Sequence, residues 1–195
     1  MELVTFLLFS TLEVLAVFVF MMAIFRENPM DFIWQTVVVS ILMGLQSHFL
    51  RGLELGYLAT VINLLCYVLF LATIVRLPLI WSGIISCTGF FIYGIVQALL
   101  VNVVGGVLLQ LVTSILFLVL SFGLYRFGFG FTADYDLLRL RWEKIMVVSV
   151  ILVAFVLLAI TMYIQESWAN ILFFGVASAL FLYYAVRKER EDMSD

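Results

Sequence analysis

Long apolar runs separated by short polar breaks dominate the pattern along the chain. A helix needs roughly 20 apolar residues to cross a hydrocarbon core of about 30 Å, and seven runs reach or nearly reach this length. They cover residues 3–25, 32–50, 55–75, 79–101, 106–125, 145–164 and 170–186. The pattern therefore predicts an all-α integral membrane protein: one polytopic domain over residues 1–195 with a bundle of seven transmembrane helices and a short charged tail at 187–195.

The break between the fourth and fifth runs is the least obvious one. A single helix over residues 79–125 would be about 70 Å long at 1.5 Å per residue, more than twice the thickness of the bilayer core. Asn102, Gly105 and Gly106 are the residues at which the chain can turn. We therefore expect two helices here, joined by a tight connection.

The composition indicates the same class of protein. Hydrophobic residues make up 66% of the 195 residues and charged residues 12%, whereas soluble domains average about 45–50% and about 25%. The two prolines, Pro29 and Pro78, both fall between apolar runs, and no Pro-, Gly- or Ser-rich linker divides the chain. Cys66 and Cys87 lie inside apolar runs, so we expect both thiols to act as small hydrophobic side chains.

Basic residues are distributed unevenly between the two sides of a seven-helix chain. One side carries Arg51 alone. The other side carries Arg26, Arg76, Arg126, Arg139, Arg141, Lys144, Arg187, Lys188 and Arg190. Cytoplasmic flanks of membrane proteins retain Lys and Arg, so the pattern predicts an N-terminus outside the cell and a C-terminus in the cytoplasm.

The longest connection, residues 126–144, reads RFGFGFTADYDLLRLRWEK. From Asp134 onward it is predicted to form an interfacial helix that runs into the sixth transmembrane helix. Its acidic residues lie near the start and its basic residues near the end, as the helix dipole favours. Leucines and a tryptophan can dip into the lipid. The following residues are therefore expected to contact lipid headgroups or a cytoplasmic partner: Arg139, Arg141, Lys144, Arg187 and Lys188.

Two further patterns predict packing. Ser82 and Ser86, with Gly83 and Cys87 beside them, repeat at four-residue spacing on the fourth helix, and small residues at this spacing allow helices to approach closely. Tryptophans lie at predicted helix ends, where amphipathic rings anchor a protein at the membrane interface. These are Trp34, Trp81, Trp142 and Trp168.

Glu13 is the main candidate for a functional residue. It lies near the middle of the first apolar run, and an ionisable side chain deep in a membrane is costly and therefore rare. We expect it to face the inside of the bundle and to be either protonated or paired. Its role would be in ligand, ion or proton handling, or in a structural hydrogen bond between helices.

Long polar side chains concentrate in the predicted outer half of the bundle. They predict an outward-facing polar crevice that holds a small polar ligand or a peptide segment; alternatively, each amide bonds to a neighbouring helix. The ligand-binding candidates besides Glu13 are Gln46, His48, Asn63, Gln97 and Gln110. The expected outer rim consists of Arg51, Glu54, Asn102 and Glu166.

Several kinds of chemistry have no sequence pattern here. The chain has no GxSxG, HExxH or P-loop motif. His48 is the only histidine, and a metal site needs several convergent ligands. We therefore expect no catalytic residue, no metal, no cofactor and no nucleic-acid partner.

The leading interpretation is a non-enzymatic sensor, receptor or accessory subunit of the bacterial cytoplasmic membrane. Seven helices with an external N-terminus resemble, in architecture, the membrane half of bacterial peptide-sensing kinases. These residues include no catalytic half, so a signal would pass to a separate protein through residues 126–144 or the tail. The alternative is a small-solute transporter, or the substrate-binding membrane component of one, which binds near the midplane. Expected partners are membrane lipids, together with a cytoplasmic or membrane protein or a second copy of the chain.

Overall fold

The computed structural model describes residues 2–101, 103–128, 130–131 and 141–192, with side chains for all of these except 2, 141–144 and 189–192. Within these ranges the chain forms helices and no strand. Seven of the helices are long and apolar enough to cross a membrane. The prediction of an all-α fold with seven helices able to span a membrane is therefore confirmed.

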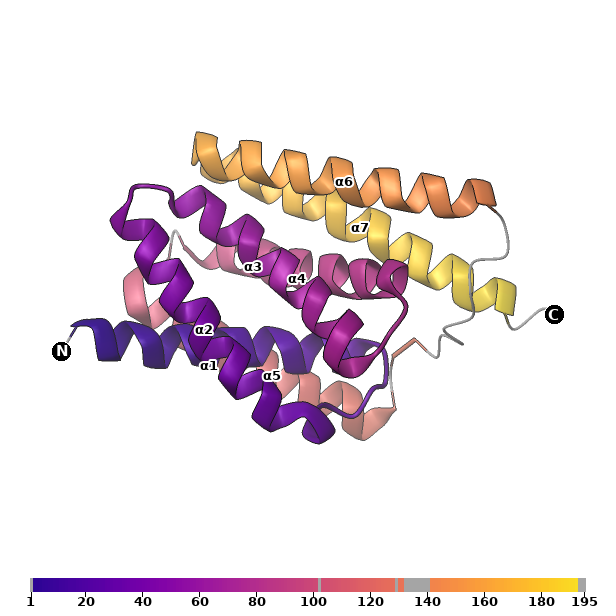
Figure 1. Ribbon diagram of the computed structural model, residues 1–195, viewed down its shortest axis with the longest axis horizontal. Coiled ribbons are helices and arrows are strands. Elements are labelled where there is room, and N and C mark those ends of the chain that lie inside the picture. The colour runs from indigo at the N-terminus through magenta and orange to yellow at the C-terminus, as the bar shows by residue number, and fades with distance from the viewer. Residues whose placement is uncertain (1, 102, 129, 132–140, 193–195) are drawn as a thin grey trace.

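Short connections join the helices from α1 to α5, and a short connection joins α6 to α7 (Figure 1). A 3-10 turn, η1, precedes the second helix at Pro29–Phe32, and a π-helical turn, η2, extends the third at Leu71–Val75. The seven helices are α1 Glu2–Ile24, α2 Ile33–Gly52, α3 Gly56–Phe70, α4 Leu79–Leu100, α5 Gly106–Phe127, α6 Arg141–Ile164 and α7 Ser167–Asp192.

Local chemistry explains two of the breaks. The side-chain oxygen of Asn28 accepts a hydrogen bond from the backbone N–H of Met30 at 3.2 Å, and Pro29 is the first residue of η1. Between α4 and α5, Gly106 has a φ of +64°, a left-handed conformation that glycine adopts without steric cost. The chain therefore turns at the predicted Gly105–Gly106 pair.

Successive helices run in opposite directions along the long axis of the bundle (Figure 1). We call the end of the bundle where α1 begins the pocket end, because the cavity lies towards it. This end also carries the connections 53–55, 101–105 and 165–166. We call the opposite end, with connection 25–28, η2 and the last turns of α7, the basic end. In Figure 1 the pocket end is on the left and the basic end on the right.

Helix α4 lies at the centre of the bundle. It packs against α1, α3, α5, α6 and α7, and it is the most buried of the seven spans. Three of its glycines each face another helix: Gly83 lies against Ile151, Gly89 against Met21 and Gly94 against Phe174. The absence of a Cβ at these positions allows α6, α1 and α7 to approach the α4 backbone closely.

The tryptophan prediction is wrong at Trp81. Its side chain is only 2% exposed and belongs to the hydrophobic core, because α4 is surrounded by other helices along most of its length. Trp34 and Trp168 are 79% and 69% exposed, as interfacial anchors require. The side chain of Trp142 lies outside the described residues.

At the basic end, the residues after α5 return to the end of α1. The backbone N–H of Phe131 donates to the carbonyl oxygen of Ile24 at 2.7 Å, and the guanidinium of Arg26 donates to the carbonyl oxygen of Gly128. The rings of Phe25 and Phe131 lie 5.5 Å apart. The predicted interfacial helix, from Asp134 to the start of α6, falls mostly on residues 132–140, which are outside the described residues.

Candidate functional site

The contact between α1 and α4 positions the candidate site. The two helices are antiparallel, and Met21 of α1 meets Gly89 of α4. Glu13 lies eight residues from Met21 on α1, and Gln97 lies eight residues from Gly89 on α4, both towards the pocket end. There Glu13 meets Gln97. Eight residues are slightly more than two helical turns, so the same faces of the two helices meet again. The close contact at Gly89 therefore brings Glu13 and Gln97 together.

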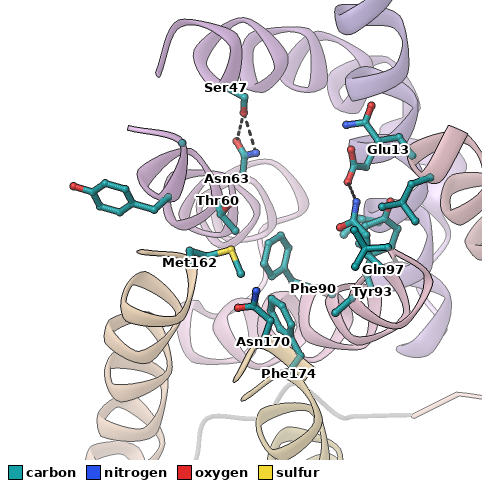
Figure 2. A pocket seen from close by; sticks show the side chains of 18 of the residues that line it. Glu13, Ser47, Thr60, Asn63, Phe90, Tyr93, Gln97, Met162, Asn170 and Phe174 are labelled. Atoms are coloured by element: carbon teal, nitrogen blue, oxygen red, sulfur yellow. Dashed lines mark hydrogen bonds between the residues drawn. The ribbon is translucent and has the colours of Figure 1, made fainter. Parts of the chain in front are cut away.

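A cavity of about 630 Å³ lies beside this pair, towards the pocket end. Its volume is within the range of small-molecule binding sites, about 300–1,000 Å³. All seven helices contribute to its lining, and it reaches exposed residues at the bundle end such as Arg51, Gln165 and Ser167. Figure 2 shows hydrogen-bonded pairs on two of its sides.

The first polar side is formed by α1, α4 and α5. The amide nitrogen Nε2 of Gln97 donates to the Glu13 carboxylate at 3.1 Å (Figure 2). Tyr93 and Gln110 also face this carboxylate, and the guanidinium of Arg51 acts on it through a favourable charge interaction. Glu13 is partly buried. Glu13 therefore faces the inside of the bundle, and its hydrogen-bond partner on α4 is the neutral amide of Gln97.

The hydroxyl of Tyr93 is held in place by a hydrogen bond to α5. It lies 2.9 Å from the hydroxyl oxygen of Thr113 on α5. Either hydroxyl can be the donor in this bond, and the Thr113 hydroxyl also lies 2.8 Å from the carbonyl oxygen of Leu109. The bond holds a buried tyrosine next to Glu13 in one orientation.

The second polar side is formed by α2 and α3. The amide nitrogen of Asn63 donates to the Ser47 hydroxyl at 3.1 Å, and the hydroxyl lies 3.4 Å from the amide oxygen (Figure 2). Thr60 lines the cavity one turn before Asn63 on the same helix. This side presents neutral donors and acceptors.

Apolar and aromatic side chains lie between the two polar sides. Phe90, Met162 and Phe174 line the cavity from α4, α6 and α7 (Figure 2). Asn170 also lines it, and its amide oxygen is buried with no hydrogen-bond partner in the part of the chain that the structure describes. A buried acceptor without a partner is costly, so this oxygen is available for a ligand group that can donate.

Four of the six ligand-binding candidates from the sequence meet at this cavity, and one rim candidate joins them. They are Glu13, Asn63, Gln97 and Gln110, with Arg51 at the rim. Gln46 and His48 are not among the lining residues. The amide atoms of Gln46 are buried without a partner among the described residues, and the exposed His48 ring lies 5.3 Å from the ring of Phe6.

The remaining candidates lie elsewhere. Glu54 and Glu166 are exposed in connections at the pocket end but do not line the cavity. Arg187 and Lys188 belong to the last turns of α7 at the basic end. Asn102 and Arg139 are outside the described residues, as are the side chains of Arg141 and Lys144.

Most of the residues that line the cavity could not be predicted from the sequence. Tyr57, Tyr67, Phe90, Met162 and Phe174 line the cavity, but each lies in an apolar run, where an aromatic or methionine side chain gives no sign of whether it faces lipid, core or cavity. A signal did exist for the tyrosines, because a buried phenol needs a hydrogen-bond partner. Tyr67 finds one in the carbonyl oxygen of Val14 at 3.2 Å.

The arrangement is suited to binding. It combines one carboxylate with neutral amides, hydroxyls and aromatic rings around a volume large enough for a small molecule. Among the described residues, no group of three or more His, Cys, Asp or Glu side chains converges on a point that would hold a metal ion.

Comparison with protein-family models, with curated proteins and with solved structures gives no match.

Proposed function

We propose that this protein is a non-enzymatic receptor or sensor of the bacterial plasma membrane, whose cavity binds a small ligand that enters from outside the cell. The observation that carries this proposal is the cavity itself. It lies among all seven helices, contains one carboxylate, and reaches the surface at one end of the bundle. Because every helix contributes to the lining, a bound ligand would contact several of them and could alter how they pack.

The proposed orientation places the pocket end outside. It is supported by the basic residues, which cytoplasmic flanks retain. Arg26, Arg76 and Arg126 lie at the basic end, whereas Arg51 lies at the pocket end. In this orientation the N-terminus is external and the C-terminus cytoplasmic.

The signal would leave the bundle through α1 and the residues after α5. α1 carries Glu13, and its last residue, Ile24, accepts a hydrogen bond from Phe131. Arg26, just after α1, donates to the carbonyl oxygen of Gly128. We propose that residues 134–144 form an interfacial helix that passes the signal to a cytoplasmic or membrane partner. The basic residues there and in the tail would bind that partner or anionic lipid.

Accessibility of the cavity provides the test. In a background with both native cysteines replaced by serine, Asn63→Cys would be treated in intact cells with a small, membrane-impermeant methanethiosulfonate. Leu65→Cys is the matched control, because Leu65 lies two residues further along α3 with its side chain exposed on the outside of the bundle. We expect rapid labelling at position 63 and none at position 65, since the reagent reacts in water and not in lipid.

Two results would contradict the proposal. Labelling of Asn63→Cys only after the cells are made permeable would place the pocket end in the cytoplasm. Equal resistance of positions 63 and 65 in intact and in permeable cells would mean that the cavity is closed to water, and a receptor for a soluble ligand could not work in this way.

Transport is the second candidate function. Glu13 lies near the middle of α1, which spans Glu2–Ile24, and transporters commonly bind their substrates near the bilayer midplane. Uptake into proteoliposomes distinguishes the two functions. Accumulation of labelled amines, amino acids or short peptides by the purified protein alone would establish transport, whereas a receptor would bind a ligand without accumulating it.

A further inference from the structure

We propose that the ligand of this cavity is an organic cation with an apolar body. Its charged group lies beside Glu13, and its body lies against the aromatic wall, by which we mean Phe90, Met162 and Phe174. The inference rests on the proposed function and names the chemical class of its ligand. It follows from the charge, the aromatic lining and the size of the cavity.

Among the residues that the structure describes, Glu13 is the only carboxylate in the lining. It accepts a hydrogen bond from the neutral amide of Gln97, which orients the carboxyl group but brings no counter-charge. Burial makes an unneutralised charge costly. A ligand ammonium group would supply the counter-charge that the surrounding amides and hydroxyls lack.

Arg51, the one cation that the described residues place in the lining, lies over the ring of Phe6. Its guanidinium carbon lies 5.4 Å from the centroid of the Phe6 ring, and its side chain is exposed at the rim. It acts on Glu13 through charge across the cavity. An exposed charge is screened by water and salt, so it leaves the local field of the carboxylate largely intact.

Aromatic rings complete the site. Tyr67, Phe90 and Tyr93 line the same cavity as Glu13, and aromatic faces attract organic cations, above all when the site is shielded from water. Further along, Met162 and Phe174 provide an apolar surface. A metal or ammonium ion would leave much of the 630 Å³ unfilled, whereas an organic cation with a ring or alkyl body would contact both surfaces.

Three probes that share a phenyl ring test the inference: benzyltrimethylammonium as the cation, benzyl alcohol as the neutral compound and phenylacetate as the anion. Binding to the purified full chain in nanodiscs would be measured by titration calorimetry, with empty nanodiscs as the blank. Protection of Asn63→Cys from labelling reports whether each probe occupies the cavity. We expect benzyltrimethylammonium to bind at least about tenfold more tightly than the other two.

Two substitutions show which groups select the cation. Glu13→Gln keeps the shape of the side chain and a hydrogen bond to Gln97, and we expect it to weaken benzyltrimethylammonium binding by about tenfold or more while benzyl alcohol is unaffected. Phe90→Leu should weaken cation binding several-fold, because the ring is lost and the apolar volume is kept. Glu54→Gln is the matched control. Glu54 is exposed at the same end of the bundle outside the cavity, so binding should not change.

The inference is overturned if phenylacetate or benzyl alcohol binds as tightly as the cation, or if Glu13→Gln retains the preference for the cation. Protection of Asn63→Cys by a neutral or anionic probe alone would also overturn it, and the receptor function would stand with a different ligand. Absence of binding by all three probes would likewise refute the cation, while labelling of Asn63→Cys would still decide the receptor function separately.

Discussion

The contact between Gly89 and Met21 allows a quantitative test of how the site is built. A Cβ atom at position 89 would collide with the Met21 side chain and lie 3.3 Å from its Cα. Met21 is fully buried, so its side chain has little room to move away. Gly89→Ala must therefore push α1 away from α4, along the same contact that brings Glu13 to Gln97.

The expected magnitude follows from two opposing effects. Forcing extra atoms into a well-packed core costs about 1–3 kcal/mol. Alanine is preferred over glycine inside a helix by roughly 0.5–1 kcal/mol. Gly123→Ala on α5 isolates the second effect, because a Cβ there meets no atom within 4 Å. The difference in unfolding free energy between the two variants should therefore equal the packing cost alone, about 1–3 kcal/mol.

Thermal unfolding of the purified variants in one detergent measures this difference. For a chain of 150–250 residues, 1 kcal/mol corresponds to about 2–4 °C in Tm. Gly89→Ala should thus unfold about 2–12 °C below Gly123→Ala. Equal Tm values for the two variants would refute the reasoning, because α1 would then have enough freedom to accept the methyl group and could not hold Glu13 in register with Gln97.

Three other substitutions test the surroundings of the site by the same unfolding measurement. Tyr93→Phe removes the hydroxyl that lies 2.9 Å from Thr113, and we expect a loss of about 0.5–1.5 kcal/mol; no loss would mean that this bond does not form in the membrane. Glu54→Gly should raise stability by up to about 1 kcal/mol, because Glu54 has a φ of +60°; a lower stability would argue against that conformation. Gly94→Ala should cost about 1–3 kcal/mol, since its Cβ would lie 2.8 Å from the Phe174 ring; an unchanged Tm would show that this ring can move.

The number of helices could be predicted from the sequence because it depends on local properties. Each apolar run has about the length that a bilayer requires, and each break contains residues that stop a helix. The clearest case is the connection between α4 and α5. Length alone excluded a single helix there, and Gly106 adopts the positive φ that only glycine takes readily.

The position of each helix within the bundle could not be predicted in the same way. In a membrane, lipid-facing and core-facing residues are both apolar, so hydrophobic periodicity gives little information on which face is buried. Trp81 illustrates the difficulty. Its place near the start of α4 suggests an interfacial anchor, yet α4 is the central helix and the ring is buried. The small residues of α4, including Ser82 and Gly83, were the better indicator of close packing.

The same reasoning explains which part of the cavity could be found. Polar groups inside an apolar run must face other protein atoms or water, so Glu13, Asn63 and Gln97 could be assigned to the interior from sequence. Nothing in the sequence distinguishes Phe90 or Met162 from residues that face lipid. The polar sides of the cavity were therefore predictable, and its aromatic wall required the structure.

α1 is the helix through which the cavity and the basic end are most directly connected. It carries Glu13 at the cavity, Met21 at the crossing with α4, and the Ile24 carbonyl that binds Phe131. A ligand changes a conformational equilibrium only through contacts that differ between the two states, and contacts at Glu13 meet this condition if α1 moves. Because Met21 and Gly89 are already in close contact, α1 cannot approach α4 further. The movements that keep this contact are a rotation of α1 and a slide along α4, and either would displace Gly128 and Phe131, which bond to Arg26 and Ile24.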